Sequence, residues 1–199
     1  MQARTSSMTL ARVVVPERSV LAEAALAVLF ALFTALMAQL VIPLPFTPVP
    51  ITGQTFAVLL TGALLGSRLG AASMILYVAL GAVGLPFYAG GAHGMQVVFG
   101  ATGGYLLGFI VADFVVGRLA ELRWDRSLQR SLPAMAAGQA VIYVLGLIGL
   151  GLALHWPANL LQLGLIPFLI GDAVKLAIAA GLLPLAWKGL AALRKRTQS

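Results

Sequence analysis

The sequence predicts an all-α integral membrane protein of six transmembrane helices, and its composition is the first evidence for this fold class. Of the 199 residues, 60% are hydrophobic and 10% are charged, whereas soluble domains contain about 25% charged residues. The mean hydropathy of +0.98 leaves no room for a separate water-soluble domain. We expect one membrane domain over residues 1–199, made of a cytoplasmic N-terminal segment, a six-helix bundle and a basic cytoplasmic tail: residues 1–19, 20–187 and 188–199.

Apolar runs are the second evidence, and they define the expected helices in chain order: residues 20–42, 55–65, 71–85, 101–116, 134–154 and 165–187. The first run has 23 residues. It is long enough to cross about 30 Å of hydrocarbon and too long for the core of a signal peptide. The second and third runs are short, but Arg68 and the glycines beside it mark a turn, so we expect two helices there.

The lysine and arginine residues predict how the helices are oriented. Twelve of the thirteen lie before the first helix, between the second and third, between the fourth and fifth, or after the sixth. The other three connections, residues 43–54, 86–100 and 155–164, contain no lysine or arginine. By the positive-inside rule both termini are cytoplasmic. The twelve residues are Arg4, Arg12, Arg18, Arg68, Arg118, Arg123, Arg126, Arg130, Lys188, Arg194, Lys195 and Arg196.

Two of the outer connections have an unusual composition. Residues 43–50 contain four prolines and no charge, and residues 85–94 are rich in glycine and aromatic residues. Proline stiffens the chain and removes an amide donor that would need a partner near lipid. We expect both segments to fold back over the mouth of a cavity. The alternative is that they are ordinary short loops.

Asp172 and Lys175 are the strongest candidates for function. They lie three residues apart in an almost wholly apolar run, where one charge costs roughly 2.5–3.5 kcal/mol. On a helix they are about 4.5 Å apart along the axis and nearly on one face. We expect this pair to face a ligand cavity. The alternative is an ion pair within the helix that only neutralises itself.

Other polar and small residues leave more than one interpretation open. Asp113 lies five residues before Arg118 at the cytoplasmic end of the fourth helix, so we expect it either to pair with Arg118 or to snorkel to that end. A stripe of alanines on the first helix either packs inside the chain or faces a partner subunit. A further set of polar residues either lines the cavity or bonds neighbouring helices: Gln39, Gln54, Gln96, Tyr105, Gln139 and Tyr143.

Several kinds of function lack the residues that they need. There is no cysteine, no Walker A loop and no G-x-S-x-G or H-E-x-x-H motif, so the chain has no loop of that kind for ATP. His93 and His155 lie far apart in the sequence, which argues against a metal centre. The basic residues form no patch interleaved with aromatics, so we expect no nucleic acid partner. We expect neither a cofactor nor an enzymatic activity.

Four motifs carry a family resemblance, in the order PFTPVPITGQT at residues 45–55, GLPFYAGG at 84–91, TGGYLLGF at 102–109 and PFLIGDAVK at 167–175. With them the chain resembles the BioY family of biotin transporters, the substrate-binding S components of energy-coupling factor (ECF) transporters. The resemblance runs from the first helix to the sixth. The sequence departs from the usual family pattern at Gly53, His93, Ala101 and Ile170, which leaves the contacts of the second outer loop open.

The resemblance implies a six-helix S component that captures biotin from the outer face of the bacterial cell (inner) membrane with high affinity. It also implies a membrane coupling protein (the T component) and two ATPase subunits as partners, which use the ATP. The family's Ala-x-x-x-Ala pattern, which contacts the coupling protein, corresponds to Ala27, Ala31 and Ala35. Its Gly-Asp-x-x-Lys motif, which contributes to biotin binding, includes Asp172 and Lys175.

Biotin has a ureido ring with two N–H donors and a carbonyl, an apolar thioether ring and a carboxylate tail. Asp172 suits the N–H groups, and Lys175 suits the ureido oxygen or the carboxylate. The remaining candidates for ligand contact are Tyr88, Phe46, Phe87, Gly90, Gly91 and Tyr105. One alternative is a stand-alone or proton-coupled secondary transporter for biotin or another vitamin, in which Asp172 carries the proton. Another is a membrane enzyme that uses the pair in acid–base chemistry.

Overall fold

The structure is a computed structural model that describes residues 8–15 and 19–196, with side chains as far as residue 193. Its helical elements are α1 Leu10–Val14, α2 Val20–Met37, α3 Gln54–Leu65, α4 Ser67–Ala82, η1 Ala89–Gly91, α5 Met95–Val98, α6 Gly103–Glu121, η2 Trp124–Arg126, α7 Leu128–Ala153, α8 Leu160–Gly164, η3 Ile166–Phe168 and α9 Leu169–Arg196. Two short antiparallel strands, β1 Val41–Ile42 and β2 Ile51–Thr52, form a hairpin in which Val41 lies opposite Thr52.

Within the described residues, four helical regions are long and apolar enough to cross a membrane: α2, α6, α7 and residues 160–193. The two shorter apolar helices, α3 and α4, correspond to the second and third expected runs. Gly66 separates them with a φ of +90°, a conformation that favours glycine, so the prediction of two helices at this point is confirmed.

The prediction that the first helix continues to residue 42 is wrong. Helix α2 ends at Met37, and residues 41–42 form strand β1 instead. Pro43 disfavours helical backbone at the residue before it, and the extended residues pair with β2. The last helix also differs: η3, which contains Pro167, precedes it, and α9 continues past residue 187 to Arg196.

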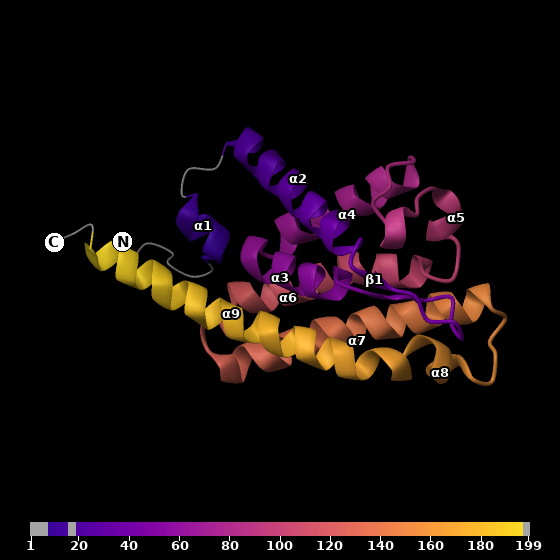
Figure 1. Cartoon of the computed structure of the whole chain (residues 1–199). Helices are drawn as coiled ribbons and strands as arrows, with labels where there is room; N and C mark the ends of the chain where they lie inside the picture. Colours follow the sequence, from indigo (N-terminus) through magenta and orange to yellow (C-terminus); the bar gives the residue numbers. More distant parts are fainter. Residues whose placement is uncertain (1–7, 16–18, 197–199) are drawn as a thin grey trace.

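The connections that carry arginine and those that carry neither lysine nor arginine lie at opposite ends of the bundle (Figure 1). Helix α1, the α6–α7 connection and the end of α9 lie at one end, where Trp187 donates to Asp125 at 2.6 Å. The hairpin loop, α5 and α8 lie at the other. The arginine-bearing connections therefore lie at one end, which we call the basic end. The three connections without lysine or arginine lie at the opposite end, which we call the uncharged end. Arg4 and Arg18 lie outside the described residues, as do the side chains of Arg194, Lys195 and Arg196.

Helix α6 is at the centre of the packing, against α3, α4 and α7. Glycines allow this close approach. A methyl group on Gly104 would lie 2.3 Å from the carbonyl oxygen of Leu145 and 2.7 Å from the Cα of Gly149, both on α7. Gly104 therefore allows the backbones of α6 and α7 to come into contact.

The alanine stripe of α2 packs inside this chain. Ala27, Ala31 and Ala35 are buried, and α2 packs against α4. The hydroxyl of Ser73 on α4 donates to the carbonyl oxygen of Ala27 at 2.8 Å. Small side chains on this face let α2 and α4 approach closely. The contact of these alanines with a partner subunit stays a prediction.

The expected pairing of Asp113 with Arg118 is also wrong. Arg118 pairs with Glu121 at 2.9 Å. Asp113 is 0% exposed and lies against Gly62 of α3 and Gly70 of α4. Neither of its carboxyl oxygens has a hydrogen-bond partner among the described residues. Five residues correspond to about 500° of helical rotation, so Asp113 and Arg118 point to different faces of α6.

Candidate ligand-binding site

A cavity of about 360 Å³ lies toward the uncharged end of the bundle. Its wall combines the proline-rich connection, the second outer connection and four helices, α3, α6, α7 and α9. The prediction that both connections cover a cavity is confirmed by the residues that line it: Pro48, Val49, Pro50, Thr52, Gln54, Thr55, Tyr88, Ala89, Ala92, Gln96, Val97, Gly100, Ala101, Thr102, Tyr105, Leu106, Phe109, Ile142, Tyr143, Phe168, Asp172 and Lys175.

Hydrogen bonds hold the two connections over the cavity. Thr47 donates to the carbonyl oxygen of Leu163 at 2.7 Å, which ties the proline-rich segment to α8. Its hydroxyl also accepts from the backbone N–H of Val49 at 3.2 Å. The second connection is held by Gly90, whose N–H donates to the carbonyl oxygen of Ala38 at 3.2 Å. Thus segments without regular structure are positioned by contacts to helices.

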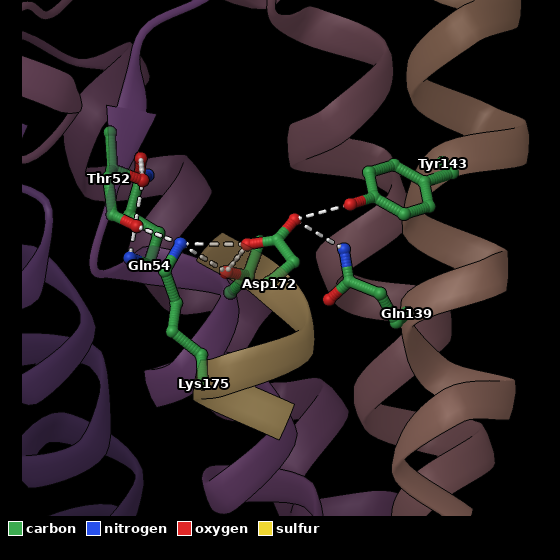
Figure 2. A network of polar contacts seen from close by, with 7 residues as sticks. Thr52, Gln54, Gln139, Tyr143, Asp172 and Lys175 are labelled. Carbon is green, nitrogen blue, oxygen red and sulfur yellow. Dashed lines mark hydrogen bonds and ion pairs between the residues drawn. The ribbon is translucent and has the colours of Figure 1, made fainter. Parts of the chain in front are cut away.

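The Asp172 carboxylate is the centre of a polar network (Figure 2). Asp172 is 5% exposed, and both of its oxygens accept hydrogen bonds. Oδ1 accepts from Lys175 at 2.7 Å and from the Thr55 hydroxyl at 3.0 Å. Oδ2 accepts from Gln139 Nε2 at 2.9 Å and from the Tyr143 hydroxyl at 2.7 Å. Three helices, α3, α7 and α9, therefore fix one carboxylate.

Lys175 is satisfied in the same way. Its Nζ donates to Asp172, to the backbone carbonyl oxygen of Thr52 at 2.6 Å and to Thr55 Oγ1 at 3.2 Å. Because an ammonium group has three hydrogens, all of its donors have acceptors. Both interpretations of the pair thus hold in part: Asp172 and Lys175 form an ion pair within α9, and both line the cavity.

Two tyrosines contribute to the apolar part of the wall, and their hydroxyls bond backbone carbonyls of the protein. Tyr105 donates to the carbonyl oxygen of Gly164 at 2.6 Å, and Tyr88 donates to that of Val78 at 2.6 Å. Burial raises the pKa of the Tyr88 hydroxyl above its usual value. The rings are therefore held still beside the cavity, which suits contact with an apolar ligand surface.

A model of the BioY family matches residues 5–192 of this chain. The chain belongs to the BioY family. The biotin transporter BioY of Thermotoga maritima is 42% identical over 139 residues, which cover 70% of this chain and 81% of that protein. The probable biotin transporter BioY of Pyrococcus horikoshii is 37% identical over 157 residues, with coverage of 79% and 91%.

A comparison with a solved structure supports the assignment of this chain to the BioY family. The fold is similar to the crystal structure of the S-component for biotin from an ECF-type ABC transporter, with a TM-score of 0.76. The two chains are 26% identical, and the match covers 84% of this chain and 92% of the other. The mostly helical membrane architecture is therefore shared with an S component.

The structure brings only part of the predicted site of this BioY protein together. Asp172, Lys175, Tyr88 and Tyr105 line the cavity. The others lie outside its lining: Phe46, which is 58% exposed, Phe87, which stacks on Tyr77, and Gly90 and Gly91, with φ of 64° and 79°. The positive φ angles give the two glycines a role in the turn of the second connection.

Three donors to Asp172 carried weaker signals in the sequence. Gln139 and Tyr143 are four residues apart, a spacing that places both side chains on one face of α7. The sequence indicates that both either line the cavity or bond neighbouring helices, and it does not indicate Asp172 as their partner. Thr55, at the end of the PFTPVPITGQT motif, was missed as a site residue because a threonine in the first turn of a helix is common.

Proposed function

We propose that this chain is a biotin-binding S component, a membrane-embedded subunit that captures biotin with high affinity for an ECF-type transporter. The observation that carries this proposal is the Asp172–Lys175 pair, which lies in the wall of a cavity rather than against lipid. The names of the relatives and of the solved S component, which specify biotin, support the choice of ligand. The proposal assigns no catalytic reaction and no cofactor to this chain.

The chemistry of the cavity suits biotin. Its volume of about 360 Å³ is within the range of roughly 300–1,000 Å³ that small-molecule sites occupy. We assign Asp172 to the ureido N–H groups and Lys175 to the ureido oxygen or the tail carboxylate. Tyr88 and Tyr105 would pack on the apolar thioether ring and chain. A bound ligand without matching donors and acceptors would leave the polar groups of Asp172 and Lys175 without hydrogen-bond partners. This cost favours selectivity for biotin.

We further propose six membrane crossings with both termini in the cytoplasm, in the inner membrane of a bacterial cell. The charge difference between the two ends of the bundle supports this orientation. Helix α3 has 12 residues and is about 18 Å long, shorter than the hydrocarbon core of about 30 Å. The hairpin before it would therefore complete that crossing.

The proposed partners are a membrane coupling protein and two ATPase subunits, which supply the energy of transport. The solved relative is described as belonging to an ECF-type ABC transporter, which supports such an assembly. This chain has no Walker A loop, so the proposal assigns ATP hydrolysis to the partners.

Isothermal titration of the detergent-purified protein with biotin tests the function, with lipoate and thiamine as controls. The wild-type protein should bind biotin and neither control. Asp172→Asn and Lys175→Ala should each weaken binding by about 1–3 kcal/mol or more, because each removes a charged partner of the ligand. A wild-type protein that does not bind biotin, or unchanged binding in both variants, would refute the proposal.

A further inference from the structure

The Asp172 carboxylate already accepts as many hydrogen bonds from the protein as a carboxylate can accept. Two donors bond Oδ1 and two bond Oδ2. A carboxylate accepts about four hydrogen bonds, so its capacity is filled. A ligand N–H group must therefore take the place of one of these donors, or share an oxygen with it. The four donors differ in whether their side chains can move to make room for the ligand.

Three of the four donors line the cavity, namely Thr55, Tyr143 and Lys175. A side chain at the cavity wall can turn its donor toward the ligand when the ligand arrives. Gln139 is different, because it is buried and is not among the lining residues. It lies on α7 one turn from Tyr143 and bonds the same oxygen, Oδ2 (Figure 2).

The orientation of the Gln139 amide is dictated by Asp172. Nε2 donates to the carboxylate, while the opposite orientation would set the amide oxygen against a negative charge. The amide oxygen, Oε1, is buried and has no hydrogen-bond partner among the described residues. A partnerless buried carbonyl is unfavourable, so Gln139 keeps its bond to Asp172 at the expense of its own second group.

We propose that Gln139 is a positioning residue, the donor that stays in place when biotin exchanges with the others and holds the Asp172 carboxylate in the plane that receives the ureido N–H groups. This inference rests on the proposed function. It assigns to Gln139 no contact with the ligand itself. Without Gln139, the carboxylate can rotate about χ2 toward Lys175, and its alignment with the ligand is lost.

A double-mutant cycle in biotin affinity tests the assignment. Gln139→Met preserves the length of the side chain and removes the donor, and we expect it to weaken binding about 10-fold, the size of one hydrogen bond to a charged group. In an Asp172→Asn background the same change should alter affinity less than about 3-fold, because there is no carboxylate left to align. Equal losses in both backgrounds would show a merely structural role and overturn the proposal.

Two further variants keep the test decisive. Gln139→Asn retains an amide that is too short to reach Oδ2, so a similar loss is expected even if the methionine variant folds poorly. Ser131→Ala removes another buried polar group of α7, whose hydroxyl donates to the carbonyl oxygen of Trp124 at 3.1 Å. This control should lower the melting temperature and leave biotin affinity unchanged; a 10-fold loss in it would overturn the proposal.

Tritiated biotin measures the weak variants as well as the wild type. The measurement on the wild-type protein distinguishes a failure of the positioning role from a failure of the proposed function. If the wild type binds biotin and the cycle is additive, only the positioning role of Gln139 fails. If the wild type does not bind biotin, the proposed function fails, and the positioning role fails with it.

Discussion

At the scale of single residues, a buried ion pair is weak evidence for stability and stronger evidence for a site. Removing two ions from water costs several kcal/mol for each ion, and an apolar replacement of the pair is often neutral or stabilising. Asp172 and Lys175 nevertheless lie in an apolar helix, with three further residues placed around the carboxylate. This arrangement is costly for packing alone, and it suits a ligand that carries both donors and acceptors.

The two roles of the pair can be separated by replacing it as a whole. In an Asp172→Leu, Lys175→Leu double variant, we expect thermal stability equal to or above that of the wild type and no measurable biotin binding. A single Asp172→Leu change should instead destabilise by about 3–5 kcal/mol, because Lys175 loses its charged partner. Thermal unfolding and titration on the same samples check this. Loss of stability in the double variant would identify the pair as structural.

At the scale of helices and strands, the sequence predicts apolar elements well and their ends poorly. Hydropathy and the glycines near Arg68 locate α3 and α4, because burial in lipid acts on every residue of a helix. The hairpin was not predicted: it depends on four residues that pair across the proline-rich loop. Likewise, hydropathy does not say which face of a helix a residue occupies, and so Asp113 was assigned to the wrong partner.

The candidate site shows the same limit of prediction from a sequence. Asp172 and Lys175 stand out because each is a charge in an apolar run, which is a local property. Gln139 lies 33 residues from Asp172 along the chain, and only the packing of α7 against α9 brings them together. Polar residues of membrane helices also bond neighbouring helices. A single sequence therefore marks the charged pair and leaves its positioning donors among many equivalent candidates.

The contact between α6 and α7 leads to a prediction at this scale. Gly104→Ala should destabilise the protein by about 1–3 kcal/mol, because the new methyl group meets backbone atoms of Leu145 and Gly149, which cannot turn away. Gly181→Ala on α9 is the matched control. Nothing lies within 4 Å of its added methyl group, so alanine should stabilise that helix by up to about 1 kcal/mol. Thermal unfolding in detergent measures both, and equal effects would contradict the packing argument.

At the scale of the whole molecule, the two ends are held closed by different means. At the uncharged end, the connections bond to helix backbone above the cavity. At the basic end, Trp187 of α9 joins the α6–α7 connection: its Nε1 donates to Asp125, and the Arg126 guanidinium lies 4.1 Å from the centre of its ring. The cavity therefore lies in a bundle whose far end is tied together by side chains.

Asp125 makes the basic end sensitive to pH. Asp125 is buried, and one of its oxygens has no partner in the described part of the chain. Burial raises the pKa of this carboxyl above its usual value, although the Trp187 N–H and the nearby Arg126 charge oppose the shift. A raised pKa in the folded state means that folding favours the protonated form. The stabilisation from protonation is complete below the unfolded pKa of about 3.9 and is lost as pH rises through the folded value.

Asp125→Asn should remove this dependence while it preserves an acceptor for Trp187. We expect the melting temperature of the variant, relative to that of the wild type, to increase as pH rises from about 4 through the folded pKa, and then to become constant. Trp187→Phe, which removes the donor, should lower the melting temperature at every pH. Melting curves of the three proteins over this pH range measure the effect, and a constant difference between wild type and Asp125→Asn would show that Asp125 does not titrate with folding.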